Sequence, residues 1–131
     1  MSKMPILLAV DTHHHFLTVA LQASDGSRKT FKDSEKNRHS EHLLPRIYDL
    51  LKQAELKPQD VDLWAVVRGI GSYTGIRVGL SAIRTLAYCT EKPCVGLLAT
   101  DLKKSNLLDL VQKLWENKDF PSLEELTPVY E

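Results

Sequence analysis

The chain has 131 residues, 43% of them hydrophobic, which is enough for one domain with a core and too short for two. Seventeen basic residues balance seventeen acidic ones, so no overall field draws the protein to nucleic acid or an anionic membrane. The apolar run from Ile6 to Val10 stops at Asp11 and is too short for a signal peptide or a membrane span. We therefore expect a cytoplasmic protein with no membrane partner.

The first half of the sequence predicts three strands and a helix. Residues 6–11 and 16–21 have the pattern of strands, and Asp25-Gly26 predicts a hairpin turn. The returning strand over 28–32 is then an edge strand with an exposed basic face. From Ser40 onward, apolar residues recur at helical spacing over 43–54. Pro45 either begins this helix or kinks it, because proline has no backbone N–H to donate.

The second half adds two strands and two helices. Residues 63–67 predict a buried strand, and an amphipathic helix over 76–88 follows a glycine-rich turn. A short strand over 94–97 precedes a helix over 107–115, which Thr100 could cap. We expect residues 1–118 to form one domain and residues 119–131 an acidic tail. The order βββαβαβα predicts an α/β fold with a mixed sheet of the ribonuclease-H-like type.

The glycine-rich turn lies in the most informative segment, GIGSYTGIR over residues 69–77. Its glycines let the backbone adopt positive φ or approach a neighbour closely, and the helix that follows presents free N–H groups. The spacing fits neither the Walker phosphate loop nor the dinucleotide fingerprint. We expect a structural loop, with Thr74 capping the helix. Its residues are Gly69, Gly71, Ser72, Tyr73, Thr74 and Gly75.

Three motifs in order resemble one known family. GIGSYTGIR is similar to the GPGSFTGLR signature of the bacterial TsaB (YeaZ) proteins, with Ile70 in place of proline. Residues 6–21 resemble the family's ILALDTS…SVAL opening, and residues 39–45 resemble its HS..LLP helix. Residues 127–130 resemble the PVYLR ending of full-length members. The chain is identified as a shortened, glycoprotease-like member with one lobe of the actin and sugar-kinase (ASKHA) type.

The resemblance implies a function. It implies a non-catalytic scaffold that binds TsaD, the enzyme that transfers a threonylcarbamoyl group to adenosine 37 of tRNA, in a complex that includes the ATPase TsaE. It implies no cofactor of the chain's own, since ATP or ADP and metal would belong to the partner complex, and tRNA would be reached only through that complex. Protease activity is not expected, because the sequence contains no HExxH zinc motif.

The two amphipathic helices are the expected interface, both with the partner and in a homodimer of the chain alone. Their apolar and small side chains exceed what one sheet face obviously needs. Two arginines on the second helix could contact an acidic surface or a nucleotide phosphate. The predicted interface residues are Leu43, Ile47, Leu51, Ile76, Gly79, Leu80, Ile83, Arg77 and Arg84.

Two alternatives remain open, a metal-dependent nuclease and a divergent self-dimerising module. Asp11 ends a strand where ribonuclease-H-like nucleases place a metal-binding carboxylate, but two-metal hydrolysis needs several converging carboxylates. Glu41 is the nearest candidate, whereas Asp60 and Asp62 lie at the far end of another strand. We interpret Asp11 as a residue that caps a turn or holds the glycine loop.

The histidines and cysteines predict no metal site. His13, His14 and His15 are consecutive, so on an extended chain they point to alternate sides and cannot share one ion. We interpret them as a solvated loop. His39 and His42 lack a third ligand, which favours a capping or surface role for His39. The two cysteines, at positions 89 and 94, are interpreted as small core residues.

Overall fold

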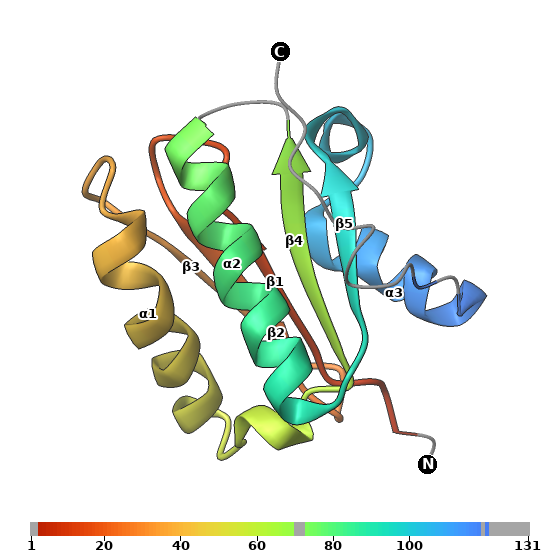
Figure 1. The fold of residues 1–131 in the computed structure, drawn as a ribbon. Coiled ribbons are helices and arrows are strands. Elements are labelled where there is room, and N and C mark those ends of the chain that lie inside the picture. The colour runs from red at the N-terminus through yellow and green to blue at the C-terminus, as the bar shows by residue number, and fades with distance from the viewer. Residues whose placement is uncertain (1–2, 70–72, 119, 121–131) are drawn as a thin grey trace.

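The computed structural model describes residues 3–69, 73–118 and 120, which contain a five-stranded mixed sheet (Figure 1). The strand order is β3-β2-β1-β4-β5. β1 pairs antiparallel with β2 and β2 with β3, whereas β4 is parallel to β1 and β5 to β4. The strands are β1 (Leu7–Asp11), β2 (Thr18–Gln22), β3 (Arg28–Lys32), β4 (Leu63–Gly69) and β5 (Cys94–Leu98). The predicted ribonuclease-H-like α/β fold is confirmed.

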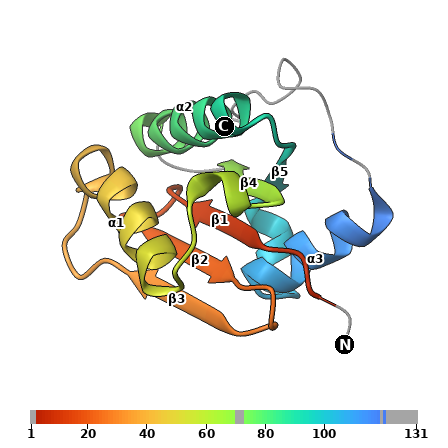
Figure 2. The ribbon, with the colours of Figure 1, turned by 90° about the horizontal axis from the view of Figure 1, so that it is seen from below.

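Three helices cover the two faces of this sheet (Figure 2). They are α1 (His39–Gln53), α2 (Tyr73–Thr90) and α3 (Leu107–Asn117). Helices α1 and α2 pack on one face, with buried β1 residues such as Leu8 and Val10. Helix α3 packs on the other face, where Leu7 and Ala9 belong to the second apolar cluster. The alternation of side chains along β1 therefore divides the core into two layers.

The N-terminal hairpin and the edge strand follow the prediction. Gly26 has φ of +87°, and Gly26 N–H donates to the carbonyl of Ala23 at 2.9 Å. Four of the five residues of β3 are exposed, as expected for a basic edge strand. Arg28 pairs with Asp109 of α3 at 2.7 Å, so the edge strand is held to the helix beneath the sheet.

The starts of α2 and α3 differ from the prediction, whereas that of α1 agrees with it. Helix α1 begins at His39, one residue before the predicted start at Ser40, and Pro45 lies inside the helix rather than at its beginning. Asn106, rather than Thr100, caps α3: its Oδ1 accepts Asp109 N–H at 2.9 Å. Helix α2 begins at Tyr73, so Thr74 lies within the first turn and not at the cap. Two short 3₁₀ turns, η1 (Pro58–Asp60) and η2 (Ala99–Lys103), complete the described elements.

The C-terminal region is described up to residue 118 and again at Phe120. The Phe120 ring lies against Trp115 of α3, with ring centroids 6.1 Å apart. The rest of the predicted tail, including the 127–130 ending, lies outside the described residues. In the part of the chain that the structure describes, we find no helix with the length and apolar character needed to cross a membrane.

Candidate functional site

The candidate site lies at one end of the sheet, where several strands finish. Strands β1, β3 and β4 all run in the same direction, so their carboxyl ends lie together at this end. Helices α1 and α2 both begin in the connections that leave it. Ligands of α/β proteins commonly bind at the carboxyl ends of strands. Three features lie here: a pocket, an Asp11 group and an Asp33 group.

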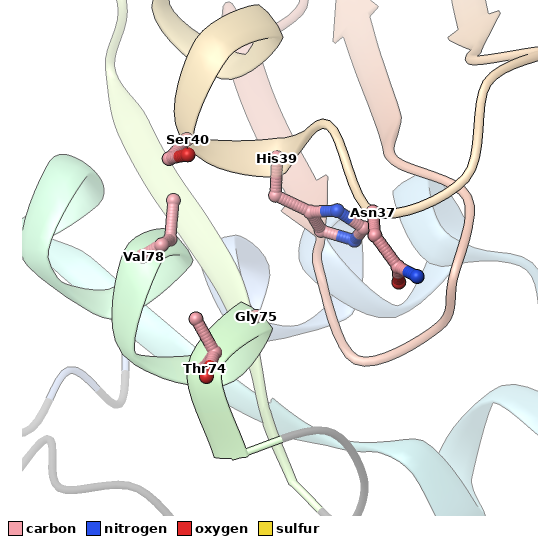
Figure 3. Close-up of a pocket in the computed structure, with 6 residues that line it drawn as sticks. All are labelled: Asn37, His39, Ser40, Thr74, Gly75 and Val78. Carbon is pink, nitrogen blue, oxygen red and sulfur yellow. The ribbon is translucent and has the colours of Figure 1, made fainter.

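The pocket lies between the N-terminal ends of α1 and α2 and has a volume of about 310 Å³ (Figure 3). It is lined by Asn37, His39, Ser40, Thr74, Gly75 and Val78. The first turn of a helix has N–H groups without intrahelical partners and a partial positive charge. Two such turns and two hydroxyl side chains therefore give the pocket a polar lining suited to a small anionic or hydroxylated group.

His39 connects this pocket to the loop after β1. Its side chain is buried, and its Nε2–H donates to the carbonyl oxygen of His14 at 2.7 Å. The residue before it, Arg38, occupies the N-cap position of α1 and makes no side-chain capping bond. The predicted capping or surface role of His39 is therefore wrong, because its ring points into the structure and holds a backbone carbonyl.

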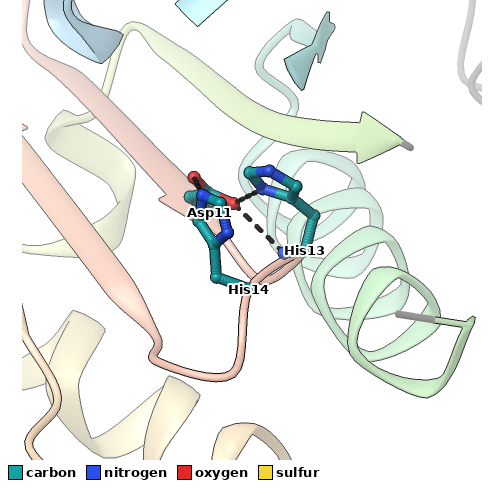
Figure 4. Close-up of side chains that lie close together, drawn as sticks. All are labelled: Asp11, His13 and His14. Carbon is teal, nitrogen blue, oxygen red and sulfur yellow. Dashed lines mark hydrogen bonds and ion pairs between the residues drawn. The ribbon is translucent and has the colours of Figure 1, made fainter. Parts of the chain in front are cut away.

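Asp11 and two histidines form a compact group at the end of β1 (Figure 4). Asp11 Oδ1 accepts His13 N–H at 3.1 Å and also bonds His13 Nδ1, which confirms that Asp11 caps a turn. His14 Nε2 lies 3.8 Å from Asp11 Oδ2, and the His13 and His14 rings are in contact, with centroids 3.6 Å apart and planes tilted by 44°. Partial burial is the main cause that lowers the pKa of His14, and the Asp11 charge opposes it.

The histidine loop is therefore not the fully solvated segment that the sequence predicted. Residues 13–16 form a bend rather than an extended strand, so two successive side chains gather on the same carboxylate. The His13 side chain is only 8% exposed, whereas that of His14 is 62% exposed. His15 is exposed, as predicted, and its Nδ1 lies 3.1 Å from Asn37 Oδ1, away from this group.

The Asp33 group was not anticipated from the sequence. Asp33 Oδ2 lies 2.5 Å from His42 Nδ1, and Asp33 Oδ1 accepts Glu35 N–H at 3.0 Å. These two hydrogen bonds, the one from His42 first, lower the pKa of the Asp33 carboxyl. The other ring nitrogen of His42 lies 3.6 Å from a Glu35 carboxylate oxygen. The sequence feature that could have indicated this group is an aspartate directly after a strand, followed by a histidine on the next helix.

Comparison with known proteins places the chain in a family. The family model for TsaD, tRNA N6-adenosine threonylcarbamoyltransferase, matches residues 33–102. The tRNA threonylcarbamoyladenosine biosynthesis protein TsaB of Bacillus subtilis is 31% identical over 100 residues, covering 76% of this chain and 44% of that protein. The protein of the same name from Escherichia coli is 30% identical over 109 residues, covering 83% and 44%. The chain belongs to the TsaB (YeaZ) family.

The solved structures agree with this assignment. YeaZ from Pseudomonas aeruginosa superimposes with a TM-score of 0.67 at 31% identity, covering 71% of this chain and 44% of that chain. A second structure, titled as an uncharacterised protein similar to YeaZ, gives a TM-score of 0.70 at 29% identity. This TsaB-family chain thus spans about 44% of the length of the curated relatives it matches.

The predicted interface of this TsaB-family chain needs correction. Six of its apolar residues are at most 3% exposed and pack in the core between the sheet and the helices. They are Leu43, Ile47, Leu51, Ile76, Leu80 and Ile83. The sheet face is broad enough to use them all, so none is left for a partner. Arg77 is exposed and Arg84 half-buried, and among the side chains that the structure describes on α1 and α2, the exposed large apolar ones are Leu44, Tyr48 and Tyr88.

Gly79 has a contact inside the chain instead of the predicted one with a partner. A Cβ atom built on Gly79 would lie 3.1 Å from Thr12 Cγ2 and closer still to Thr12 Oγ1. Thr12 is fully buried directly after β1. Gly79 therefore allows α2 to approach the end of β1, which also brings the start of α2 close to the candidate site.

The family's glycine signature is only partly described. Gly69 ends β4 with φ of +152°, a conformation that favours glycine. Gly75 is buried in the first turn of α2 and lines the pocket. Gly71 and Ser72 lie outside the described residues, so the structural role of the whole loop stays a prediction.

The carboxylates required for the nuclease alternative are engaged elsewhere. Glu41 accepts from Arg38 at 3.0 Å on the surface of α1. Asp60 accepts Lys57 N–H and Asp62 accepts Ile6 N–H, each at 2.8 Å, before the start of β4. Within residues 3–69, 73–118 and 120, the potential metal ligands grouped with Asp11 are His13 and His14, and this group contains no second carboxylate.

Proposed function

We propose that this chain is a non-catalytic subunit in the biosynthesis of threonylcarbamoyladenosine in tRNA. One observation carries the proposal: curated relatives named TsaB match 76% to 83% of the chain at about 30% identity. The chain would bind a TsaD-type catalytic subunit, and a TsaE-type ATPase would join the same assembly. ATP or ADP would then be bound by the partner complex, and tRNA would be reached only through it.

The outward face of α1 is the proposed contact surface for the TsaD-type subunit and for a homodimer of the chain alone. Leu44 and Tyr48 are 45% and 47% exposed and stand one helical turn apart. Exposed neighbouring apolar side chains favour a protein partner. Arg84 acts electrostatically on Cys94 of β5, so the two arginines of α2, Arg77 and Arg84, would contact an acidic partner surface separate from that of α1. The buried leucines and isoleucines position the two helices but do not reach the partner.

Reconstitution tests the proposed function. Unmodified tRNA is incubated with cognate TsaD, TsaE, ATP and threonylcarbamoyl-adenylate in a mixture that lacks any other TsaB. Adding the full chain should produce modified adenosine, which is measured by nucleoside mass spectrometry. No modification at any concentration of the chain would contradict the proposal. Turnover of ATP or nucleic acid by the chain alone, abolished by Asp11→Asn, would favour the enzyme alternative.

A pair of matched variants tests the contact surface. Leu44→Asp places a charge on the outward face of α1 and should lower the affinity for TsaD and the yield of modified tRNA together. Met4→Asp introduces the same charge at an apolar side chain of similar exposure, 38%, which lies before β1. This control should leave TsaD binding unchanged. An equal loss of affinity in both variants would assign the effect to general destabilisation and not to the surface.

A further inference from the structure

Two imidazole side chains and one carboxylate side chain lie close together at the end of β1 (Figure 4). One nitrogen of His13, one nitrogen of His14 and an oxygen of Asp11 all lie within 4.8 Å of one another. The three side chains come from four consecutive residues, because the chain bends directly after the strand. The proposed function as a subunit makes no use of this group.

The donor atoms match a transition metal better than Mg²⁺ or Ca²⁺. Neutral imidazole and carboxylate are typical Zn²⁺ ligands at about 2.0–2.2 Å, so two ligand atoms on one tetrahedral ion lie about 3.3 Å apart. His14 Nε2 and Asp11 Oδ2 are 3.8 Å apart, and a small rotation of the exposed His14 ring would close this difference. Mg²⁺ and Ca²⁺ prefer sets of oxygen ligands.

The backbone that carries the three donors is already fixed. Asp11 pairs with Thr18 in the β1–β2 ladder. The carbonyl oxygen of His14 accepts from His39 at 2.7 Å, and that of His15 accepts from Asn37 N–H at 2.8 Å. An ion would therefore bind without ordering the loop, which removes a large part of the entropic cost of binding.

The exposure of the donors fits an open site. Asp11 and His13 are nearly buried, whereas the His14 side chain is 62% exposed. An ion would enter past His14, and at least one coordination position would face solvent. Three protein ligands with one open position are typical of an exchangeable or catalytic Zn²⁺ site rather than a closed structural one.

The second group is a weaker candidate for the same ion. Asp33, Glu35 and His42 offer only one imidazole. The Asp33 group serves below as an internal comparison.

We propose that Asp11, His13 and His14 bind one Zn²⁺ ion per chain, with a coordination position open to solvent. This differs from the expectation that the chain holds no metal of its own. That expectation assumed an extended backbone, in which consecutive side chains diverge, whereas the bend at residues 13–16 brings two of them together.

Zinc titration of the full chain tests the site. The protein is prepared without a histidine tag, stripped with a chelator and titrated with Zn²⁺ against a chromophoric competitor. The expected result is one Zn²⁺ per chain, with binding at least about tenfold weaker in His14→Ala and unaffected by excess Mg²⁺. Because His14 is exposed, this variant should fold, which circular dichroism of the metal-free protein checks. Absence of stoichiometric binding, or displacement of Zn²⁺ by Mg²⁺, would overturn the proposal.

Two controls separate this site from its neighbours. His15→Ala removes the adjacent histidine, whose ring contacts Asn37 instead of Asp11, and should leave Zn²⁺ affinity unchanged. His42→Ala disrupts the Asp33 group and should also leave it unchanged. Equal losses in His14→Ala and His15→Ala would indicate a loose histidine tract, and loss only in His42→Ala would move the ion to the Asp33 group. Either result would overturn the assignment.

Discussion

His39 Nε2 lies 2.7 Å from the carbonyl oxygen of His14 and donates its proton to it. This bond joins the first residue of α1 to the loop after β1, 25 residues earlier in the chain. It crosses the candidate site, because His39 lines the pocket while the His14 ring belongs to the Asp11 group. The conformation of the histidine loop therefore depends on the placement of α1.

We predict that His39→Phe lowers the free energy of unfolding by about 1–3 kcal/mol. Phenylalanine keeps most of the ring volume but leaves the carbonyl of His14, in a partly buried hydrogen bond, without its donor. Urea denaturation followed by fluorescence measures the change. His39→Gln retains an N–H donor and should lose less, and His15→Ala, at an exposed ring, should have little effect. If the phenylalanine variant is as stable as the parent chain, this hydrogen bond does not contribute to the free energy of unfolding.

We predict that Gly79→Ala destabilises the fold by about 1–3 kcal/mol, although alanine is the better helix former. The new methyl group would overlap the buried Thr12 side chain. Ser81→Ala, at an exposed position of the same helix, should change stability by less than about 0.5 kcal/mol. Unfolding midpoints of the two variants give the comparison, and a more stable Gly79→Ala would contradict the close contact.

A double variant tests whether Thr12 is the cause. Thr12 Oγ1 is buried and has no hydrogen-bond partner in the described part of the chain, so Thr12→Ala removes an unsatisfied hydroxyl together with the steric obstacle. Combined with Gly79→Ala, it should recover part of the lost stability. Strictly additive effects of the two substitutions would show that the residues do not interact.

The sequence predicted the sheet well because its central strands are continuous apolar runs. β1 and β4 are buried on both faces, and apolar runs of this short length, bounded by turn residues, are typical of buried strands. The sequence placed α1 from Ser40 onward, one residue from its start at His39, but it did not decide whether Pro45 begins the helix or lies inside it. Periodicity also located the apolar faces of α1 and α2, but it could not show that the chain's own sheet covers them.

The candidate site was less predictable than the fold. The assumption of an extended chain separated His13 from His14, whereas a local bend places both on Asp11. The Asp33 group depends on how β3 and α1 pack, which no local pattern contains. Cys94 was correctly predicted to be buried, but Cys89 is exposed, although the last turn of α2 still packs on the sheet, where Thr90 accepts a hydrogen bond from Trp64 of β4.

We predict that the two cysteines differ strongly in reactivity. Burial raises the pKa of the Cys94 thiol to about 11, so little reactive thiolate forms near neutral pH. Cys89 is exposed. A disulfide reagent should modify one thiol of the native protein quickly and the second only after unfolding. Cys89→Ser should remove the fast phase, and two equal fast phases in the native protein would contradict the burial of Cys94.

We predict that His42 links stability to pH through Asp33. Its hydrogen bond is the main cause that holds the pKa of Asp33 below the ordinary value of 3.8. A lowered folded-state pKa stabilises the protein above the unfolded-state pKa, and this contribution is lost as pH falls through the lowered folded-state pKa. His42→Ala should therefore be less stable than the parent chain at about pH 6 and should lose less stability between about pH 6 and pH 3.

Urea midpoints across this pH range measure both effects. His15→Ala, which lies outside the Asp33–His42 pair, should keep the acid dependence of the parent chain. Parallel curves for the parent and His42→Ala would show that the hydrogen bond does not determine the titration of Asp33.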